Sequence, residues 1–332
     1  MAPRRLPVSP LRAALTAAVV VALATAGCGG PTAPTPRQSG PLAATCLPSL
    51  TVPATSAQGA LVNYPLAAAT GGQAPVKVTC TPASGQVFPI GTTPVTCTAT
   101  DAAAASASCA FPLVVAAPPE LTRTNFMAFG DSITAGEVTV PVAARGSDHG
   151  LPVFRQVVVP TAAYPTALER MLTSRYVAQQ PQVVNEGRPG ESAGDAEPRL
   201  LRALEVDRPD AVLLLMGYND LSSSARRIRA VATMERMAKD VRGYGARLFL
   251  ATLTPPVPGR QRAIETSAIV AYNDDIRILA AGEGAVLVDL YEAMLPNAAA
   301  WIGVDGLHPT EAGYAFIAET FYAAVRADLE RR

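Results

Sequence analysis

The segment "FGDSIT", residues 129–134, holds one serine, Ser132, directly after a glycine and an aspartate. All three are ordinary turn formers, so the segment alone also fits a simple turn. A serine hydroxyl acts as a nucleophile only when a base lies within hydrogen-bond reach. The chain has two histidines, His149 and His308, and His308 follows Asp305 by three residues in "DGLHP". In such a short loop Asp305 can hold the imidazole and leave its Nε2 for Ser132.

Acyl transfer by a serine also needs hydrogen-bond donors that face the developing oxyanion. The backbone amide of Ser132 is one candidate donor. Gly190, in "VVNEGRPGES", has no Cβ to obstruct a ligand, and Asn219, in "LLLMGYND", carries a side-chain N–H. Together these residues predict a covalent acyl-enzyme mechanism, for which neither a metal nor an organic cofactor is expected.

From about residue 118 onward, strands alternate with helices. Five apolar runs have the length of strands, at 126–129, 182–185, 211–217, 247–253 and 285–290. Amphipathic stretches follow the pattern of helices, at 162–178, 192–206, 222–242, 260–282 and 310–330. This alternation predicts a parallel sheet with helices on both faces. Ligands of such sheets bind at the carboxyl ends of the strands, where the motifs above are found.

The motifs GDSIT, N-x-x-x-x-G-E-S, G-x-N-D and D-x-x-H-P, in this order, resemble the four motif blocks of the SGNH (GDSL) hydrolases. The resemblance covers about residues 124–330 and is strongest to the lysophospholipase/thioesterase-like branch. It implies a flavodoxin-like three-layer α/β fold. It also implies that Ser132 is the nucleophile, Asp305 the acid and His308 the base. The implied oxyanion donors are the N–H groups of Ser132, Gly190 and Asn219.

Two glycines compete for one of these roles. Gly187 and Gly190 lie in the same segment, and we favour Gly190 because it directly precedes "ES", as in the family pattern. Asp131 and Asp220 adjoin motif residues, and we expect both to brace the rim of the site by hydrogen bonds.

A segment at 138–160 is inserted between the first motif and the first long helix, and it predicts a β-hairpin flap beside the site. Asp148 and His149 would lie at its tip, where a solvated turn is expected in preference to a metal or catalytic site. Trp301 either packs beneath the DGLHP loop or forms a wall of the acyl pocket. The flap and Tyr218 would narrow that pocket, which predicts acyl chains of about two to six carbons. No long apolar lid helix is visible in the sequence, so no interfacial activation is expected.

The N-terminus has the pattern of an export signal. Arginines precede an apolar run at 13–26 that is too short for a typical membrane span, and residues 1–27 are predicted to be a signal peptide. The segment "LATAGCGG" resembles a bacterial lipoprotein signal, with Cys28 lipidated after cleavage. An ordinary secretory signal cleaved near Ala26 is the alternative. Residues 28–41 are rich in Pro, Gly, Thr and Ser, as in an extended tether.

Residues 42–117 have few charges and short alternating runs between Gly and Pro turns, which predicts a small β-sandwich. The segment from "VTCTPASG" to "CAFPLVV" resembles the HYR module, an immunoglobulin-like extracellular domain, and implies spacing or adhesion rather than catalysis. Four cysteines lie here and allow three disulfide pairings. In an immunoglobulin-like topology the two "VTC" strands are neighbours and the first and last strands pair, which implies the disulfides Cys80–Cys97 and Cys46–Cys109.

Lys plus Arg and Asp plus Glu both number 27, and no basic stripe indicates a nucleic-acid partner. We therefore predict an exported, membrane-tethered serine esterase acting on a small-molecule, glycan or lipid ester. Carbohydrate O-acetyl esters, lysophospholipids and thioesters all remain open as substrates. The alternative is a surface-binding protein that acts through the HYR-like module and has an inactive hydrolase domain. All five site roles are filled, which argues against that alternative.

Overall fold

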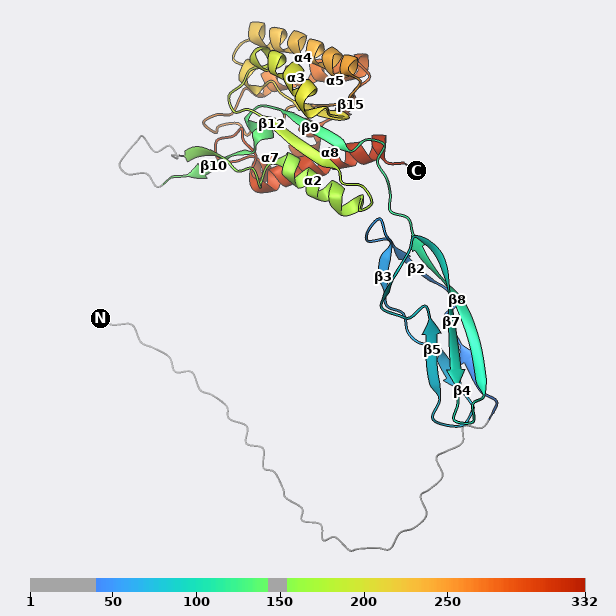
Figure 1. Cartoon of the computed structure of the whole chain (residues 1–332). Coiled ribbons are helices and arrows are strands. Elements are labelled where there is room, and N and C mark those ends of the chain that lie inside the picture. Colours follow the sequence, from blue (N-terminus) through green and yellow to red (C-terminus); the bar gives the residue numbers. More distant parts are fainter. Residues whose placement is uncertain (1–39, 143–153, 332) are drawn as a thin grey trace, which may run out of the picture.

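The computed structural model describes residues 40–142 and 154–331, which form an all-β part followed by an α/β part (Figure 1). The predicted signal peptide with Cys28, and Asp148 and His149 at the predicted flap tip, lie outside the described residues. No helix within the described ranges is both long and apolar enough to cross a membrane.

The all-β part is a small sandwich. A four-stranded sheet has the order β2-β8-β7-β5, and two further pairs, β1–β4 and β3–β6, complete it. Alternate residues of β7 and β8, such as Val95, Phe111 and Leu113, are buried, as expected for strands with one face toward a core. The strands are β1 (Ala43–Thr45), β2 (Leu50–Pro53), β3 (Ala60–Val62), β4 (Ala68–Thr70), β5 (Lys77–Thr81), β6 (Gln86–Phe88), β7 (Gly91–Thr100) and β8 (Ser106–Ala116).

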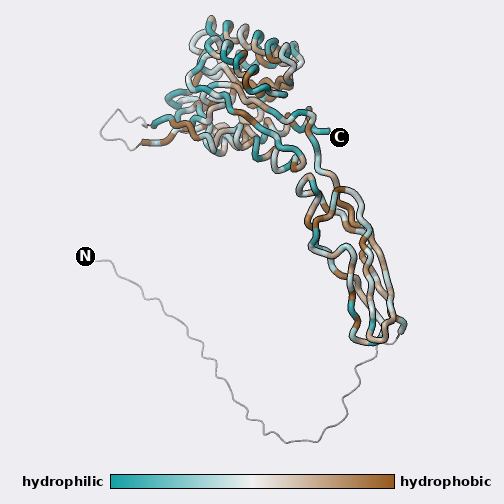
Figure 2. The backbone as a smooth tube through the Cα atoms, in the orientation of Figure 1, coloured by the Kyte–Doolittle hydropathy of each residue, from teal (hydrophilic) through white to brown (hydrophobic). Residues whose placement is uncertain are grey.

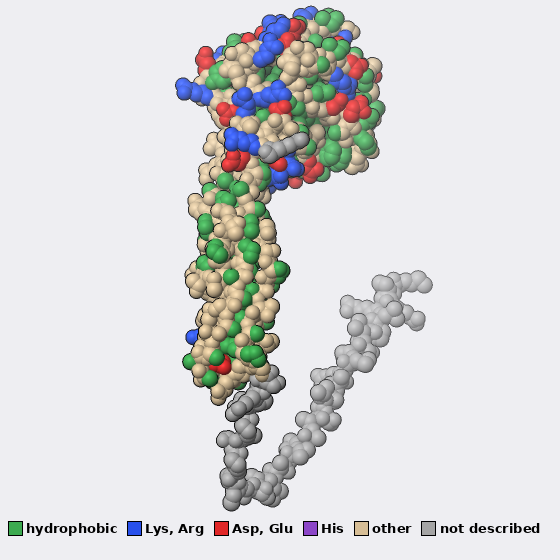
Figure 3. Space-filling view, turned by 90° about the vertical axis from the view of Figure 1, so that its right-hand side faces the viewer, with side chains coloured by type: hydrophobic (Ala, Val, Ile, Leu, Met, Phe, Trp, Pro, Cys, Tyr) green, Lys and Arg blue, Asp and Glu red, His purple; other side chains and the backbone are tan. Residues whose placement is uncertain are grey.

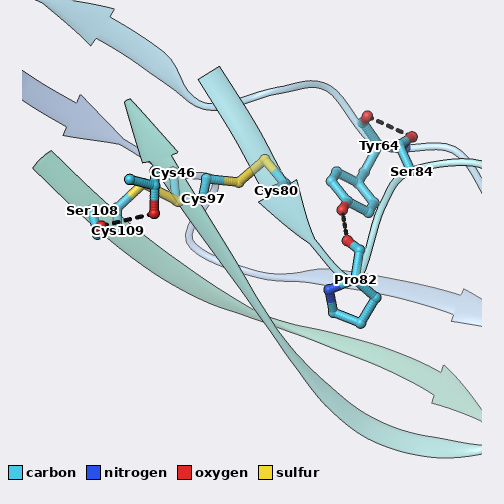
Figure 4. The surroundings of a disulfide bond; sticks show 9 residues. Cys46, Tyr64, Cys80, Pro82, Ser84, Cys97, Ser108 and Cys109 are labelled. Atoms are coloured by element: carbon cyan, nitrogen blue, oxygen red, sulfur yellow. Dashed lines mark hydrogen bonds between the residues drawn. A yellow bond between two sulfur atoms is a disulfide. The ribbon is translucent and has the colours of Figure 1, made fainter. Parts of the chain in front are cut away.

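Both disulfides expected from the sequence, Cys80–Cys97 and Cys46–Cys109, are present in the structure. Cys80 and Cys97 are direct cross-strand partners on β5 and β7. Figure 4 shows them beside Tyr64, whose hydroxyl donates a hydrogen bond to the Pro82 carbonyl. The expected pairing of the first and last strands was wrong in detail, because β1 pairs with β4, whereas β2 pairs in parallel with β8.

The α/β part has a five-stranded sheet in the order β12-β9-β13-β14-β15, and every pair in it is parallel. Helices α3, α4 and α5 cover one face, and α2 and α8 cover the other (Figure 1). The result is the three-layer architecture predicted from the sequence. The strands are β9 (Asn125–Gly130), β12 (Gln182–Gly187), β13 (Ala211–Leu215), β14 (Arg247–Ala251) and β15 (Val286–Val288), and the long helices are α2 (Tyr164–Arg175), α3 (Ala193–Asp207), α4 (Ser224–Tyr244), α5 (Thr266–Gly282) and α8 (Glu311–Leu329).

The central strands are buried on both faces, and every residue of β13 is inaccessible to solvent. Figure 2 shows hydrophobic and hydrophilic residues alternating along the covering helices, which is the pattern of helices with one face on a core. The long helices coincide with the predicted amphipathic stretches, except that α5 begins at Thr266 rather than at residue 260. The segment before it, 252–265, is a loop at the carboxyl end of β14.

The inserted segment forms two antiparallel arms, β10 (Glu137–Pro141) and β11 (Phe154–Val158), as predicted for a hairpin. Its arms are described, whereas residues 143–153 are not. Short helices complete the part: α1 (Ser132–Ala135), η1 (Tyr218–Asp220), α6 (Leu290–Met294), η2 (Leu295–Asn297) and α7 (Ala298–Trp301).

Candidate active site

Ser132 is the first residue of α1, a single helical turn that follows β9 after Asp131. The Asp131 Oδ1 atom accepts a hydrogen bond from the Ile133 amide at 3.1 Å, which is the usual interaction of an N-cap aspartate. This cap holds the turn so that the serine lies at the carboxyl end of the central sheet. The sequence predicted the position of Ser132 but not the helical turn.

Ser132, His308 and Asp305 lie together. His308 Nε2 is 3.0 Å from Ser132 Oγ, and His308 Nδ1 is 2.6 Å from Asp305 Oδ2. Because a carboxylate only accepts hydrogen bonds, Nδ1 carries the proton and Nε2 is free to accept from the serine hydroxyl. Asp305 and His308 are almost completely buried, so water competes little for these contacts.

Asp305 is stabilised in its charged form. Burial alone would raise its pKa, but the hydrogen bond with the His308 side chain and those from the Leu307 and His308 amides lower the pKa below its usual value. A charged Asp305 can hold the Nδ1 proton and stabilise an imidazolium.

The two other aspartates form the bracing hydrogen bonds expected of them. Asp220 Oδ2 accepts from the Ala193 amide at 2.9 Å and so ties η1 to the start of α3. Burial raises the pKa of Asp131 to about 7, and the Asp131 Oδ2 atom is buried without a hydrogen-bond partner among the described residues. Asp131 therefore favours its neutral form more than an ordinary carboxyl does.

The structure separates the roles of the two competing glycines. A Cβ at Gly187 would lie 2.1 Å from the Ala135 nitrogen, so Gly187 lets α1 pack against β12. A Cβ at Gly190 would meet nothing within 4 Å, and Gly190 has a φ of +76°, a conformation that favours glycine. Gly190 is therefore the one with open space for a ligand. Asn219 Nδ2 donates to the Glu191 carbonyl at 2.9 Å, which brings the Asn219 side chain to the Gly190 loop.

Two buried charged residues near the site were missed in the sequence. Arg199, on α3, donates to the carboxylates of Glu186 and Glu191 and to the Gly130 carbonyl, so it joins the loop of Gly190 to the end of β9. Arg199 could have been recognised in the sequence as an arginine on the core-facing side of an amphipathic helix. Glu137, the residue after "GDSITAG", has Oε1 3.6 Å from His308 Nε2.

A cleft of about 440 Å³ adjoins Asn219, and Tyr218, Leu307 and Arg262 are among its lining residues. The Tyr218 hydroxyl donates to the Thr254 carbonyl at 2.6 Å, which fixes the ring in the cleft wall. Trp301 stacks on Phe316 of α8 with ring centroids 3.9 Å apart, and it does not line this cleft. Its position agrees with the packing role, one of the two alternatives for this residue.

The model of the GDSL-like lipase/acylhydrolase family matches residues 128–316, more than half of the chain. The protein belongs to this family. The SGNH (GDSL) hydrolase resemblance seen in the motifs is thereby confirmed, and the α/β part is an ester-hydrolase domain. The HYR domain model matches residues 51–115, as the sequence predicted. The comparison with curated proteins gave no match.

Solved structures of similar fold include a lipase/acylhydrolase from Enterococcus faecalis, with 22% identity and a TM-score of 0.51 over 62% of this chain and 97% of that one. The α/β hydrolase enzyme LAE5 from the metagenome of Lake Arreo, Spain, has 24% identity and a TM-score of 0.49, over 61% and 94% of the two chains. An acetylxylan esterase from Geobacillus stearothermophilus, represented by a catalytic mutant, has 19% identity and a TM-score of 0.47, over 61% and 94%. The E. faecalis structure supports the fold of this GDSL hydrolase domain.

In this GDSL hydrolase the described residues contain no group of three or more His, Cys, Asp or Glu side chains that could hold a metal ion.

Proposed function

We propose that this protein is an exported serine esterase that hydrolyses carboxylic esters through Ser132, His308 and Asp305. The observation that carries the proposal is the pair of contacts around the imidazole, 3.0 Å from Nε2 to Ser132 Oγ and 2.6 Å from Nδ1 to Asp305 Oδ2. A serine is activated as a nucleophile when a base accepts its proton and an acid orients that base, and these two contacts provide both interactions.

In the first half-reaction, Ser132 Oγ attacks the ester carbonyl carbon while His308 Nε2 takes the hydroxyl proton. The carbonyl oxygen becomes an oxyanion, for which the Ser132 and Gly190 amides and the Asn219 side-chain N–H are the donors. Collapse of this intermediate breaks the bond to the alcohol, which leaves with the proton from Nε2. Losing one oxyanion donor typically costs about 3 kcal/mol of barrier.

In the second half-reaction, water attacks the acyl–Ser132 ester and passes a proton to His308 Nε2. The second tetrahedral intermediate then collapses, Ser132 Oγ recovers its proton, and the carboxylic acid leaves. Asp305 keeps the imidazole oriented in both halves and stabilises each imidazolium.

We further propose a preference for acyl chains of about two to six carbons. The cleft beside Asn219 is lined by Tyr218 and Leu307. The Tyr218 hydroxyl is hydrogen-bonded within the protein, so its ring keeps the cleft narrow. A longer chain would leave methylenes in water and forgo about 0.8 kcal/mol for each one. The N-terminal segment through Cys28 is proposed to direct export and lipid anchoring, with residues 42–117 as a spacer.

The test is hydrolysis of nitrophenyl esters from acetyl to decanoyl by the wild type and by Ser132→Ala. We expect the wild type to be fastest with the short esters and Ser132→Ala to lose at least about 10⁴-fold of the rate. An active Ser132→Ala protein would contradict the proposed nucleophile. A specificity constant that climbs through decanoyl would contradict the acyl preference and favour a lysophospholipase.

A further inference from the structure

Glu137 lies beside the imidazole although none of the four motif blocks includes it. Its Oε1 is 3.6 Å from His308 Nε2, the same nitrogen that lies 3.0 Å from Ser132 Oγ. The Glu137 side chain is 9% exposed, so its charge is only weakly screened by water. In the part of the chain that the structure describes, no Lys or Arg nitrogen lies within 4.0 Å of its carboxylate, and His308 Nε2 is the one nitrogen of an ionisable side chain that does.

The backbone around Glu137 is fixed from both sides. Helix α1 ends at Ala135 and is capped by Gly136, which has a φ of +88° and where a Cβ would lie 2.5 Å from the Ala163 side chain. The Glu137 carbonyl then accepts a hydrogen bond of 2.6 Å from the Tyr314 hydroxyl on α8. The Glu137 backbone is therefore anchored at the root of the hairpin.

The leaving group must come close to this carboxylate. His308 Nε2 gives its proton to the alcohol oxygen that leaves, so that oxygen comes within hydrogen-bond distance of Nε2. Since Glu137 Oε1 is 3.6 Å from Nε2, that oxygen lies no farther than about 7 Å from the carboxylate oxygen.

We propose that Glu137 selects the leaving group by charge. It accepts hydrogen bonds from a neutral, hydroxyl-rich alcohol, attracts a cationic one, and repels one that carries a phosphate or carboxylate. This inference rests on the proposed function, because it requires the alcohol to leave beside His308. Among the substrate classes still open, it favours acylated carbohydrates and other uncharged polyols over phosphate-bearing lysophospholipids and thioesters.

Nearby arginines are held by other groups. Arg260 Nη1 donates to the carbonyls of Ile302 and Gly303, at 2.6 and 2.7 Å, which fixes its position and leaves its positive charge in place. Arg262 lines the cleft together with Glu265, so the two formal charges there offset each other. The other carboxyls of the site, Asp305 and Asp131, add no positive charge, so among the described residues no cation is paired with the Glu137 carboxylate.

The test compares three acetate esters with related phenolic leaving groups. They are the acetates of methyl 4-hydroxybenzoate, which is neutral, of 4-hydroxybenzoate, which is anionic, and of 4-hydroxyphenyltrimethylammonium, which is cationic. Each kcat/KM is divided by the rate constant for hydroxide-catalysed hydrolysis of the same ester, which removes differences in intrinsic reactivity. The enzymes are the full-length wild type, Glu137→Gln and, as a matched control, Glu319→Gln, which removes one exposed carboxylate of α8.

We expect the wild type to favour the neutral over the anionic ester by about tenfold, the size expected of one unit charge roughly 6 Å away at a partly solvated site. Glu137→Gln should bring this ratio close to one and lower the preference for the cationic ester, whereas Glu319→Gln should leave both ratios unchanged. The comparison of the three esters in the wild type alone does not depend on the folding of any variant.

Equal normalised rates for all three esters in the wild type would overturn the proposal, as would unchanged ratios in a folded Glu137→Gln protein. Those results would leave the proposed esterase function intact. Failure of the wild type to hydrolyse even the neutral ester would instead contradict the proposed function, and this inference would fall with it.

Discussion

Charged side chains are distributed very unevenly between the two parts of this protein. In residues 42–117 only Lys77 and Asp101 are charged, and Figure 3 shows few charged atoms on that part of the surface. The α/β part is densely charged on its surface and also contains every buried polar or charged residue of the described ranges. Several of these lie near the carboxyl ends of the strands, among them Asp131, Ser132, Glu137, Arg199, Asp220, Asp305 and His308.

Burying a charge or an unpaired polar group costs free energy, so a group of such residues at one edge of a sheet is more typical of a functional site than of packing alone. The β-sandwich buries apolar residues and is cross-linked by two disulfides, as suits a small domain with a limited core. The larger core of the α/β part tolerates a group of buried charges at one edge of its sheet. We infer that the first part is built for stability and the second for chemistry, and the predictions below test that division.

The largest expected effect is kinetic. Asp305→Asn should lower kcat by about 10⁴-fold, because an asparagine amide no longer fixes the proton on His308 Nδ1. The control is Asp274→Asn, an exposed residue of α5 whose side chain is 60% accessible, and it should change kcat less than twofold. Steady-state kinetics on a nitrophenyl ester measure both. A loss smaller than tenfold in Asp305→Asn would mean that Asp305 does not orient the base.

The next effect is on stability and depends on pH. Burial raises the pKa of Asp131 to about 7, so the folded protein keeps a proton that the unfolded chain releases near pH 4. The stability that this proton confers is fully present below about pH 4 and is lost as the pH rises through 7. Between pH 4.5 and pH 8 the wild type should therefore lose stability relative to Asp131→Asn, by on the order of a few kcal/mol.

Urea unfolding followed by the fluorescence of Trp301, the only tryptophan, reports this difference for the α/β part alone. Asparagine can still accept the hydrogen bond from the Ile133 amide, so the cap of α1 is retained. Stability curves of the two proteins that run parallel between these pH values would show that Asp131 titrates normally.

The third prediction concerns the β-sandwich. Replacing Cys80 and Cys97 together by alanine should destabilise residues 42–117 by about 2–4 kcal/mol, because the unfolded state of this part is no longer cross-linked. Hydrogen exchange of its strands measures the loss. Ester hydrolysis and Trp301 unfolding should not change, and a parallel loss of activity would show that the two parts are coupled.

The smallest expected effect is that of removing the sandwich. Residues 118–332 alone should hydrolyse small esters with a kcat/KM within about threefold of the full chain, since all five proposed site residues lie in this segment. A truncated protein with native Trp301 fluorescence and no activity would mean that the sandwich helps to build the site.

Much of the α/β part could be predicted from the sequence because its signals are local. Each strand is a compact apolar run, and three motif blocks closely follow strands, so the parallel topology brings Ser132, Gly190 and Asn219 to one rim. The fourth block, with His308, was expected at the end of the last strand, but α6, η2 and α7 separate it from β15. The disulfides could be predicted from the strand order of a recognisable module. The pairing of β1 could not be predicted, because a strand of three residues has too short a pattern to indicate its partner.

The contact of Glu137 with His308 could not be predicted in the same way. It depends on how the root of the inserted hairpin packs beside the His308 loop and on the Tyr314 hydroxyl that holds it, and no periodic pattern encodes such packing. The late start of α5 has a local reason that was overlooked, since prolines at 255, 256 and 258 favour a loop at the end of β14. Arg199 was visible as a charge on the apolar face of α3, but its partners lie on other elements.

Covalent labelling shows whether Ser132 is the nucleophile. Wild-type protein is treated with a fluorophosphonate, and the adduct is located by intact mass and peptide sequencing. We predict one adduct per chain, on the peptide that contains Ser132, and none on folded Ser132→Ala or on heat-denatured wild type. An adduct on another serine, or labelling of Ser132→Ala to the wild-type extent, would contradict this role of Ser132.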